Sequence, residues 1–181
     1  MSTSLEMKDV QKRYGGLHVV RDFNLHVRPG EFVTFLGPSG SGKTTALKMI
    51  AGFEAPSSGD IFLDGRSIVD LPPYERGIGM VFQNYALFPH MTVAENVAFP
   101  LTVRYVARKE AREKVARALQ LVQMEGYADR YPNQLSGGQQ QRIALARAIV
   151  FDPSILLMDE PLGALDRNLR QHMKIEIMRI Q

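Results

Sequence analysis

The stretch EFVTFLGPSGSGKTTALKMI, residues 31–50, decides the fold class of this chain. It predicts a buried strand at residues 32–36, a glycine-rich loop and a helix at residues 45–50. Residues 37–44 match G-x-x-x-x-G-K-[ST], in which glycines let consecutive backbone N–H groups turn toward phosphate oxygens. The positive end of the following helix favours an anion at the same place. The order strand, loop, helix therefore predicts a nucleotide site in an α/β domain.

Lys43 is expected to reach the β- and γ-phosphates and is a catalytic candidate, while the Thr44 hydroxyl is expected to ligate Mg²⁺. The nucleotide-binding candidates in and beside this loop are Gly37, Pro38, Ser39, Gly40, Ser41, Gly42, Lys43, Thr44 and Thr45. The alternative is a chance glycine turn, but the four fixed positions recur by accident in only about 0.6% of chains of this size. The nucleotide hypothesis is therefore favoured.

A second apolar run, ILLMDEP at residues 155–161, ends on two acids. Asp159, at the end of the predicted strand, is placed to hold Mg²⁺ through water. Glu160, one residue further, is placed to polarise an attacking water. A solvated strand end is the alternative for either acid. Beside a phosphate loop we expect Asp159 to be a metal ligand and Glu160 to be the catalytic base.

Composition limits the class of protein. The chain has 181 residues, of which 45% are hydrophobic and 23% charged, as expected for one soluble domain with its own core. It has no cysteine, which excludes disulfides and thiolate metal sites and fits a reducing cytosol. A net charge of +3 favours scattered surface charge over a nucleic-acid site. No run approaches the roughly 18 apolar residues of a membrane span, and no signal peptide is evident.

The remaining patterns predict an α/β core with an antiparallel β part near the N-terminus and a helical insert at residues 84–135. The expected elements are a strand at 18–27, a hairpin at 60–68 turning at Asp64 and Gly65, a buried strand at 77–83, and an amphipathic helix at 107–122 with Gly126 as its stop. Continuous apolar strands of this kind suit a parallel sheet covered by helices.

The stretch NQLSGGQQQRIALARA, residues 133–148, places a glycine pair at the start of a predicted helix. Glycine there costs backbone entropy, so the pair needs a reason outside the helix. Two residues without side chains allow close approach, and Ser136, the N–H groups and the helix dipole all suit an anion. The alternative is a poorly capped surface helix.

With these residues in place, the sequence resembles the nucleotide-binding domain of ATP-binding cassette (ABC) transporters over essentially its whole length. LSGGQ, at residues 135–139, matches the signature motif of that family. The resemblance implies a P-loop NTPase (RecA-like) core with an N-terminal antiparallel β subdomain and an inserted α-helical subdomain, forming a single domain over residues 1–181. It also implies that the signature binds the γ-phosphate of ATP held by a second copy of the chain. The signature candidates are Ser136, Gly137, Gly138 and Gln139.

Other family elements carry over residue by residue. Gln83 matches the Q-loop glutamine, implied to contact the metal, to act in catalysis and to sense the membrane partner. Tyr14 matches the aromatic residue that stacks on adenine, and an ordinary core or surface tyrosine is the alternative. Residues 164–166 match the D-loop, although Gly163 replaces the usual serine before it.

The end of the chain departs from the family pattern. The family expects a histidine beyond the D-loop, past Gln181, and His18, His26, His90 and His172 all lie in the wrong context. An apolar stripe over residues 165–180 has no stop signal. We therefore expect a chain that is incomplete at its C-terminus, without the last core strands or any regulatory domain.

Residues 71–101 resemble importer ATPases of binding-protein-dependent uptake, most nearly those for spermidine and putrescine. Relatives for ferric iron, sulfate, maltose and glycerol-3-phosphate follow closely, and the solute stays open. The resemblance implies ATP and Mg²⁺ as cofactors, and hydrolysis coupled to transport at the cytoplasmic face of the cell membrane. The implied partners are a second copy, membrane-spanning permease subunits and, indirectly, a solute-binding protein. An apolar cluster able to receive a permease helix, or to serve the core, comprises Tyr85, Leu87, Phe88, Pro89 and Met91.

Two other function classes fit the sequence less well. An ABC ATPase of DNA repair or translation usually carries a long coiled-coil insert or two cassettes, and this chain has neither. Its basic stretch at residues 104–114 is interrupted by acids and lacks an aromatic platform, so no nucleic-acid partner is expected. A scaffold that binds ATP without hydrolysis would need no base, and Glu160 argues against it.

Overall fold

The computed structural model describes residues 3–159 of the chain. The chain folds into two compact units, one ending at Ile78 and the other beginning at Gly79. Each unit has its own secondary structure and its own buried residues. No helix in the described part is long and apolar enough to cross a membrane.

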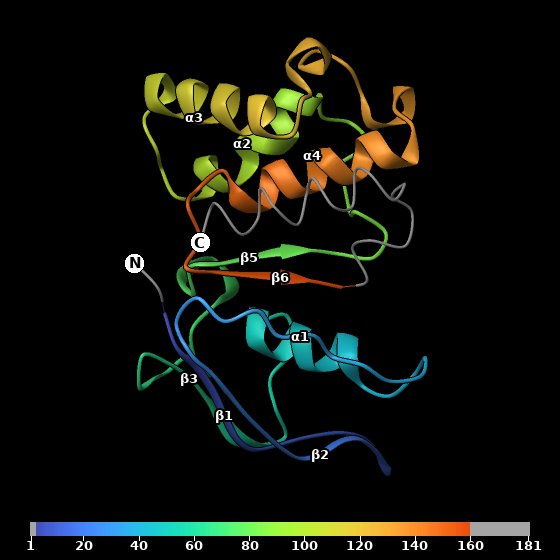
Figure 1. Cartoon of the computed structure of the whole chain (residues 1–181), viewed down its shortest axis with the longest axis vertical. Helices are drawn as coiled ribbons and strands as arrows, with labels where there is room; N and C mark the ends of the chain where they lie inside the picture. Colours follow the sequence, from blue (N-terminus) through green and yellow to red (C-terminus); the bar gives the residue numbers. More distant parts are fainter. Residues whose placement is uncertain (1–2, 160–181) are drawn as a thin grey trace. The chain divides into compact units, whose positions relative to one another are not determined.

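The first unit consists of an antiparallel sheet and one α-helix (Figure 1). Its elements are β1 (Leu5–Tyr14), β2 (Leu17–Val27), α1 (Lys43–Ala51), β3 (Ser58–Leu63), β4 (Arg66–Ser67) and the 3₁₀ turn η1 (Pro73–Glu75). The strand order is β2-β1-β3-β4, with β1 antiparallel to both of its neighbours. The predicted antiparallel region is therefore present.

Turn chemistry explains the hairpin between β3 and β4. Asp64 and Gly65 both have positive φ, 46° and 76°. A two-residue turn with left-handed conformation at both positions matches the right-handed twist of the strands, and Asp-Gly is a preferred pair for it. The predicted hairpin turn is confirmed.

Helix α1 ends at a buried arginine. Gly52 follows the helix with φ 88°, and a Cβ there would lie 2.5 Å from Nε of Arg76. The Arg76 guanidinium donates to the carbonyl oxygens of Met49 and Ile50, at 2.8 and 3.0 Å. The Met49 carbonyl also accepts from the Gly52 N–H at 3.3 Å, so Arg76 and Gly52 together satisfy the C-terminal end of α1.

The predicted strand at residues 32–36 is not formed. Residues 31–38 have no regular secondary structure. Phe32 and Leu36 are 57% and 90% exposed. A strand exists only beside a partner, and none of the described strands pairs with this run.

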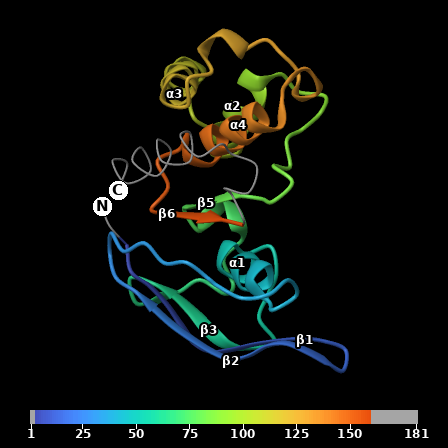
Figure 2. The ribbon, with the colours of Figure 1, turned by 45° about the vertical axis from the view of Figure 1, so that its right-hand side comes forward.

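The second unit places three helices on one side of a pair of strands (Figures 1 and 2). Its elements are β5 (Ile78–Val81), α2 (Val93–Val103), α3 (Arg108–Leu121), η2 (Glu125–Tyr127), η3 (Pro132–Gln134), α4 (Gly137–Ile149) and β6 (Ile155–Met158). β5 and β6 are neighbours, and their arrows run in the same direction in Figure 1. The helices share a core that includes Val97, Leu101, Leu119 and Ile143.

Helix α3 ends before its predicted stop. Gln123 takes the left-handed conformation, with φ 57°, that was expected of Gly126. Its N–H donates to Gln120 O, and the Met124 N–H donates to Leu119 O, which together form a Schellman motif. Met124 is 1% exposed, so burial of its side chain fixes the helix end without a glycine.

Candidate nucleotide-binding site and signature helix

The phosphate loop, residues 37–44, belongs to the first unit and leads directly into α1. Gly42 is the N-cap of α1, with φ 90°. A Cβ at Gly42 would lie 2.9 Å from the carbonyl oxygen of Val19 on β2. Gly40 has φ 79° as well. Conformation and close packing both require glycine at position 42.

The Lys43 side chain contacts the loop that precedes it. Its Nζ donates to the carbonyl oxygens of Gly37 and Pro38, both at 2.8 Å. The loop contains no acid, and the first turn of α1 has none either. Phosphate oxygens are stronger partners for an ammonium group than neutral carbonyls are. The helix N-terminus and Lys43 therefore fit a phosphate group.

Tyr14 lies at the end of β1 in the same unit and is 46% exposed. Its hairpin partner strand β2 is the strand that contacts Gly42 through Val19. The hairpin that carries the aromatic candidate thus also supports the phosphate loop.

Gln83 and Asp159 follow neighbouring strands of the second unit. The Asp159 N–H donates to the carbonyl oxygen of Val81 at 3.0 Å, so Asp159 lies beside the end of β5. Asp159 is 4% exposed, whereas Gln83 is exposed. Carboxyl ends of parallel strands are where α/β proteins place ligands. Within residues 3–159 no group of three or more acids or histidines is gathered for a metal. Mg²⁺ needs only one or two protein ligands beside water and phosphate, so these residues still fit it.

The signature lies at the start of α4. Ser136 is the N-cap: its Oγ accepts from the Gln139 N–H at 3.4 Å, and Gln139 Oε1 accepts from the Ser136 N–H at 2.9 Å. This reciprocal pair is a capping box, a local signal that the S-x-x-Q spacing encodes and that was missed at the level of sequence. The helix start is therefore well capped, and the poorly capped alternative is wrong.

The glycines of the signature are not required by the part of their own unit that the structure describes. A Cβ at Gly137 or Gly138 would meet no atom within 4 Å, and neither residue has a positive φ. This contrasts with Gly42, which the fold requires. The described residues therefore give no steric or conformational reason for either glycine.

Sequence reasoning missed two buried polar residues that hold the segment after Gln83. Asn96 is fully buried, accepts from the Phe88 N–H and donates to carbonyls of that segment, including Phe88 O at 3.1 Å. Arg147 on α4 donates to the carbonyls of Tyr85 and Ala86. A polar residue within an apolar helical run, as in IALARAIV, was the available signal.

The predicted site residues fall into both units. The phosphate loop and Tyr14 lie in the first unit, and Gln83, Asp159 and the signature lie in the second. Glu160, the D-loop, His172 and the stripe at 165–180 lie outside the described residues.

Comparison with protein families gives a match to the family model described as ABC transporter, over residues 20–163. The spermidine/putrescine import ATP-binding protein PotA of Clostridium novyi is 50% identical over 98% of this chain and 51% of the relative. The protein of the same name from Trichodesmium erythraeum is 53% identical over 97% of the chain and 46% of the relative. The chain spans about half the length of these curated relatives.

Among solved structures, the ATP-binding cassette MJ0796, in a dimeric post-hydrolysis state bound to ADP and Pi, is similar with a TM-score of 0.88. It is 36% identical, and the match covers 96% of this chain and 81% of that one. A second dimeric structure of the same cassette matches with the same TM-score. The predicted fold class, a P-loop NTPase core with antiparallel β and helical subdomains, is confirmed.

Proposed function

The chain belongs to the ABC transporter family, and from this premise we propose that it is the ATP-binding and ATP-hydrolysing part of an importer for spermidine or putrescine. The choice of solute rests on the names of two relatives, which are 50 and 53% identical to this chain. Permease subunits are its membrane partners, a solute-binding protein acts indirectly, and its place is the cytoplasmic face of the cell membrane. The single domain with a helical insert at 84–135 belongs to the same proposal.

ATP binds with its phosphates at the N-terminus of α1. Lys43 exchanges its two carbonyl partners for phosphate oxygens, and the loop N–H groups donate to the same anion. Thr44, Gln83 and Asp159 are the residues that would hold Mg²⁺, which would neutralise phosphate charge. Tyr14 stacks on the base, and Glu160 accepts the proton of the attacking water.

The signature serves ATP held by a second copy of the chain. Ser136 and the first N–H groups of α4 supply donors, and the helix dipole favours the γ-phosphate. The observation that carries this step is the open space at Gly137 and Gly138, since none of residues 79–159 of their unit requires glycine there. A phosphate approaching from another chain does need it.

The apolar segment after Gln83 receives the permease. Tyr85 and Leu87 pack partly against the core of the second unit, while Pro89 is exposed. The Phe88 ring lies 4.7 Å from that of Phe99. The segment therefore divides its side chains between core and surface, and its exposed part is available to a partner.

Mixed dimers test the trans arrangement. Two variants of the complete gene product, Lys43→Ala and Ser136→Arg, are each expected to be inactive as homodimers. In the proposed dimer each ATP site takes its phosphate loop from one chain and its signature from the other. In a mixed dimer one site therefore contains both substitutions, and the other has an intact Lys43 and an intact Ser136. Mixing should restore measurable ATP hydrolysis. A mixture that stays as inactive as its parents, with mixed dimers shown to form, would contradict the proposal.

Uptake assays test the solute. Cells that lack the gene should lose ATP-dependent accumulation of labelled spermidine or putrescine and keep uptake of sulfate and ferric iron. If uptake of a different solute is lost while polyamine uptake stays intact, the polyamine assignment is wrong and the chain serves an importer for that other solute.

A further inference from the structure

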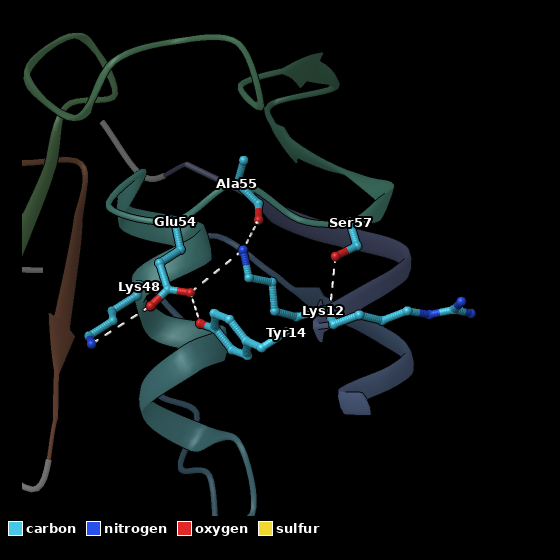
Figure 3. A network of polar contacts seen from close by, with 7 residues as sticks. Lys12, Tyr14, Lys48, Glu54, Ala55 and Ser57 are labelled. Carbon is cyan, nitrogen blue, oxygen red and sulfur yellow. Dashed lines mark hydrogen bonds and ion pairs between the residues drawn. The ribbon is translucent and has the colours of Figure 1, made fainter. Parts of the chain in front are cut away.

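Tyr14 is held by a network of charged side chains (Figure 3). Its hydroxyl donates to Oε2 of Glu54. Lys12 Nζ lies 3.7 Å from the same oxygen and 5.0 Å from the centroid of the Tyr14 ring. Lys48 Nζ lies 3.8 Å from Oε1 of Glu54. The phenol ring is therefore fixed at its hydroxyl and contacted on one face by a cation.

The partners of Tyr14 are themselves held in place. Lys12 Nζ donates to the carbonyl oxygen of Ala55 at 2.6 Å. The Arg13 N–H donates to Ser57 Oγ at 3.0 Å, and the Ser57 N–H donates to Gln11 O at 2.8 Å. The side chains of Lys12 and Glu54 are only 15 and 22% exposed. The end of β1 is thus tied along its length to the segment that follows α1.

Through Lys48 the network reaches α1 itself. Lys48 belongs to the last turn of that helix, and its carbonyl oxygen accepts from the Phe53 N–H at 2.9 Å. The helix begins at the phosphate loop. One rigid element therefore joins the expected phosphate site to the residue that holds the tyrosine.

We propose that Glu54 and Lys12 are positioning residues for the adenine base, because Glu54 fixes the Tyr14 hydroxyl and Lys12 places its cation over the ring, while the residue stays 46% exposed. This rests on the proposed ATP site and adds to it two residues that fix the Tyr14 ring before ATP arrives. Immobilising one side chain in advance is worth about three- to tenfold in Kd.

The test compares ATP with inorganic triphosphate, which has no base, by equilibrium binding to the complete gene product. Glu54→Ala and Tyr14→Phe each remove one side of the hydroxyl contact. Each should weaken ATP binding about three- to tenfold and leave triphosphate binding unchanged. Both changes remove the same contact. The double variant should therefore bind ATP about as tightly as whichever single variant has the lower ATP affinity. Glu54→Gln keeps an oxygen acceptor and should restore most of the affinity.

Glu6→Ala is the matched control, because Glu6 is also an acid of the first unit paired with a lysine, Lys8 at 3.1 Å. It should bind both ligands as the parent does. If Glu54→Ala weakens ATP and triphosphate equally, Glu54 only supports α1 and the positioning role is overturned. If Glu54→Ala and Tyr14→Phe change neither ligand, it is overturned as well.

Tyr14→Ala separates this inference from the proposed function. If Tyr14→Ala loses ATP affinity and Glu54→Ala does not, the positioning role alone fails. If Tyr14→Ala binds ATP as tightly as the parent, the base stack itself fails and the positioning role falls with it. Binding of triphosphate, which depends on Lys43, reports the phosphate site in either case.

Discussion

The guanidinium of Arg147 donates a hydrogen bond of 2.7 Å to the carbonyl oxygen of Tyr85. A second bond of 2.8 Å reaches the carbonyl of Ala86. Both acceptor residues have positive φ, 61° and 45°, which residues other than glycine rarely adopt. Burial lowers the pKa of Arg147 to about 10, so its charge persists at neutral pH. The helix that starts at the signature therefore holds the strained segment after Gln83.

Replacing Arg147 by methionine should destabilise the protein. The change removes two hydrogen bonds from a charged group to carbonyls of a strained turn, and the expected loss is about 2–4 kcal/mol of unfolding free energy. Urea denaturation measures it. Arg117→Met, on the exposed face of α3, is the matched control and should change stability by less than about 0.5 kcal/mol. Equal midpoints for the two variants would contradict the role of Arg147.

Lys43→Ala and Glu160→Gln should separate binding from hydrolysis. Lys43→Ala removes the only cation of the phosphate loop, so ATP binding should be lost. Glu160→Gln keeps the binding groups and removes the base, so hydrolysis should fall about 10²- to 10⁴-fold while ATP still binds. Binding of a fluorescent ATP analogue and phosphate release measure the two effects. Light scattering should show an ATP-bound dimer of Glu160→Gln, and near-parental hydrolysis would exclude Glu160 as the base.

Gly137→Ala should fold normally and lose hydrolysis. Its Cβ would meet no described atom within 4 Å, and Gly137 has no positive φ, so the melting temperature should stay the same or rise. Under the proposed trans arrangement, activity should fall because the added methyl group would obstruct the approach of the partner's phosphate. Gly126→Ala is the control: its Cβ would also meet no described atom within 4 Å, and the variant should keep both its stability and its activity. A fully active Gly137→Ala dimer would mean that no ligand comes close to this residue.

Gly59→Ala should damage the first unit. Gly59 has φ 83°, and a Cβ there would overlap the backbone of Asp9, at the irregular step between β1 and β3. Relief requires the strands to move apart, so a loss of more than about 2 kcal/mol is expected by thermal or chemical unfolding. Gly15 also has a positive φ, but a Cβ there would meet no described atom within 4 Å, so Gly15→Ala should lose less unfolding free energy.

Acid should weaken the start of α2. The Thr92 backbone N–H donates to Glu95 Oε2 at 2.7 Å, and this bond, with that of the Thr92 hydroxyl, lowers the pKa of Glu95. Because the carboxyl pKa is lower in the folded state, the ionised Glu95 stabilises the fold at a pH above its ordinary pKa of 4.5. This stabilisation is lost as the pH falls through the pKa of the folded state. Glu95→Gln should therefore lower the melting temperature at pH 7, with a difference that shrinks below pH 4.5. A difference independent of pH would show that the charge is not involved.

Local patterns in the sequence predicted the parts of this protein that need only neighbouring residues. The Asp64–Gly65 turn and helix α3 were predicted because turn conformation and helical periodicity are set within a few residues. The sequence also placed residues 37–44 and 135–139 at helix starts, where the structure has the beginnings of α1 and α4. Their phosphate-binding roles stay predictions. The S-x-x-Q capping box was equally local and was overlooked, although Ser136 and Gln139 encode it.

Tertiary structure alone decided features whose partners lie far away in the chain. The apolar run at residues 32–36 reads as a strand, but strand formation depends on a pairing partner, which no local pattern supplies. Gln123 replaces glycine at the end of α3 because burial of Met124 outweighs the cost of a left-handed residue. Arg147 contacts Tyr85, 62 positions earlier, and Glu54 contacts Tyr14, 40 positions earlier. The sequence determined which residues we predict to bind phosphate, because that chemistry is local. The folded chain decided which residues hold them in place, because a buried polar group takes whichever partner the packing brings to it.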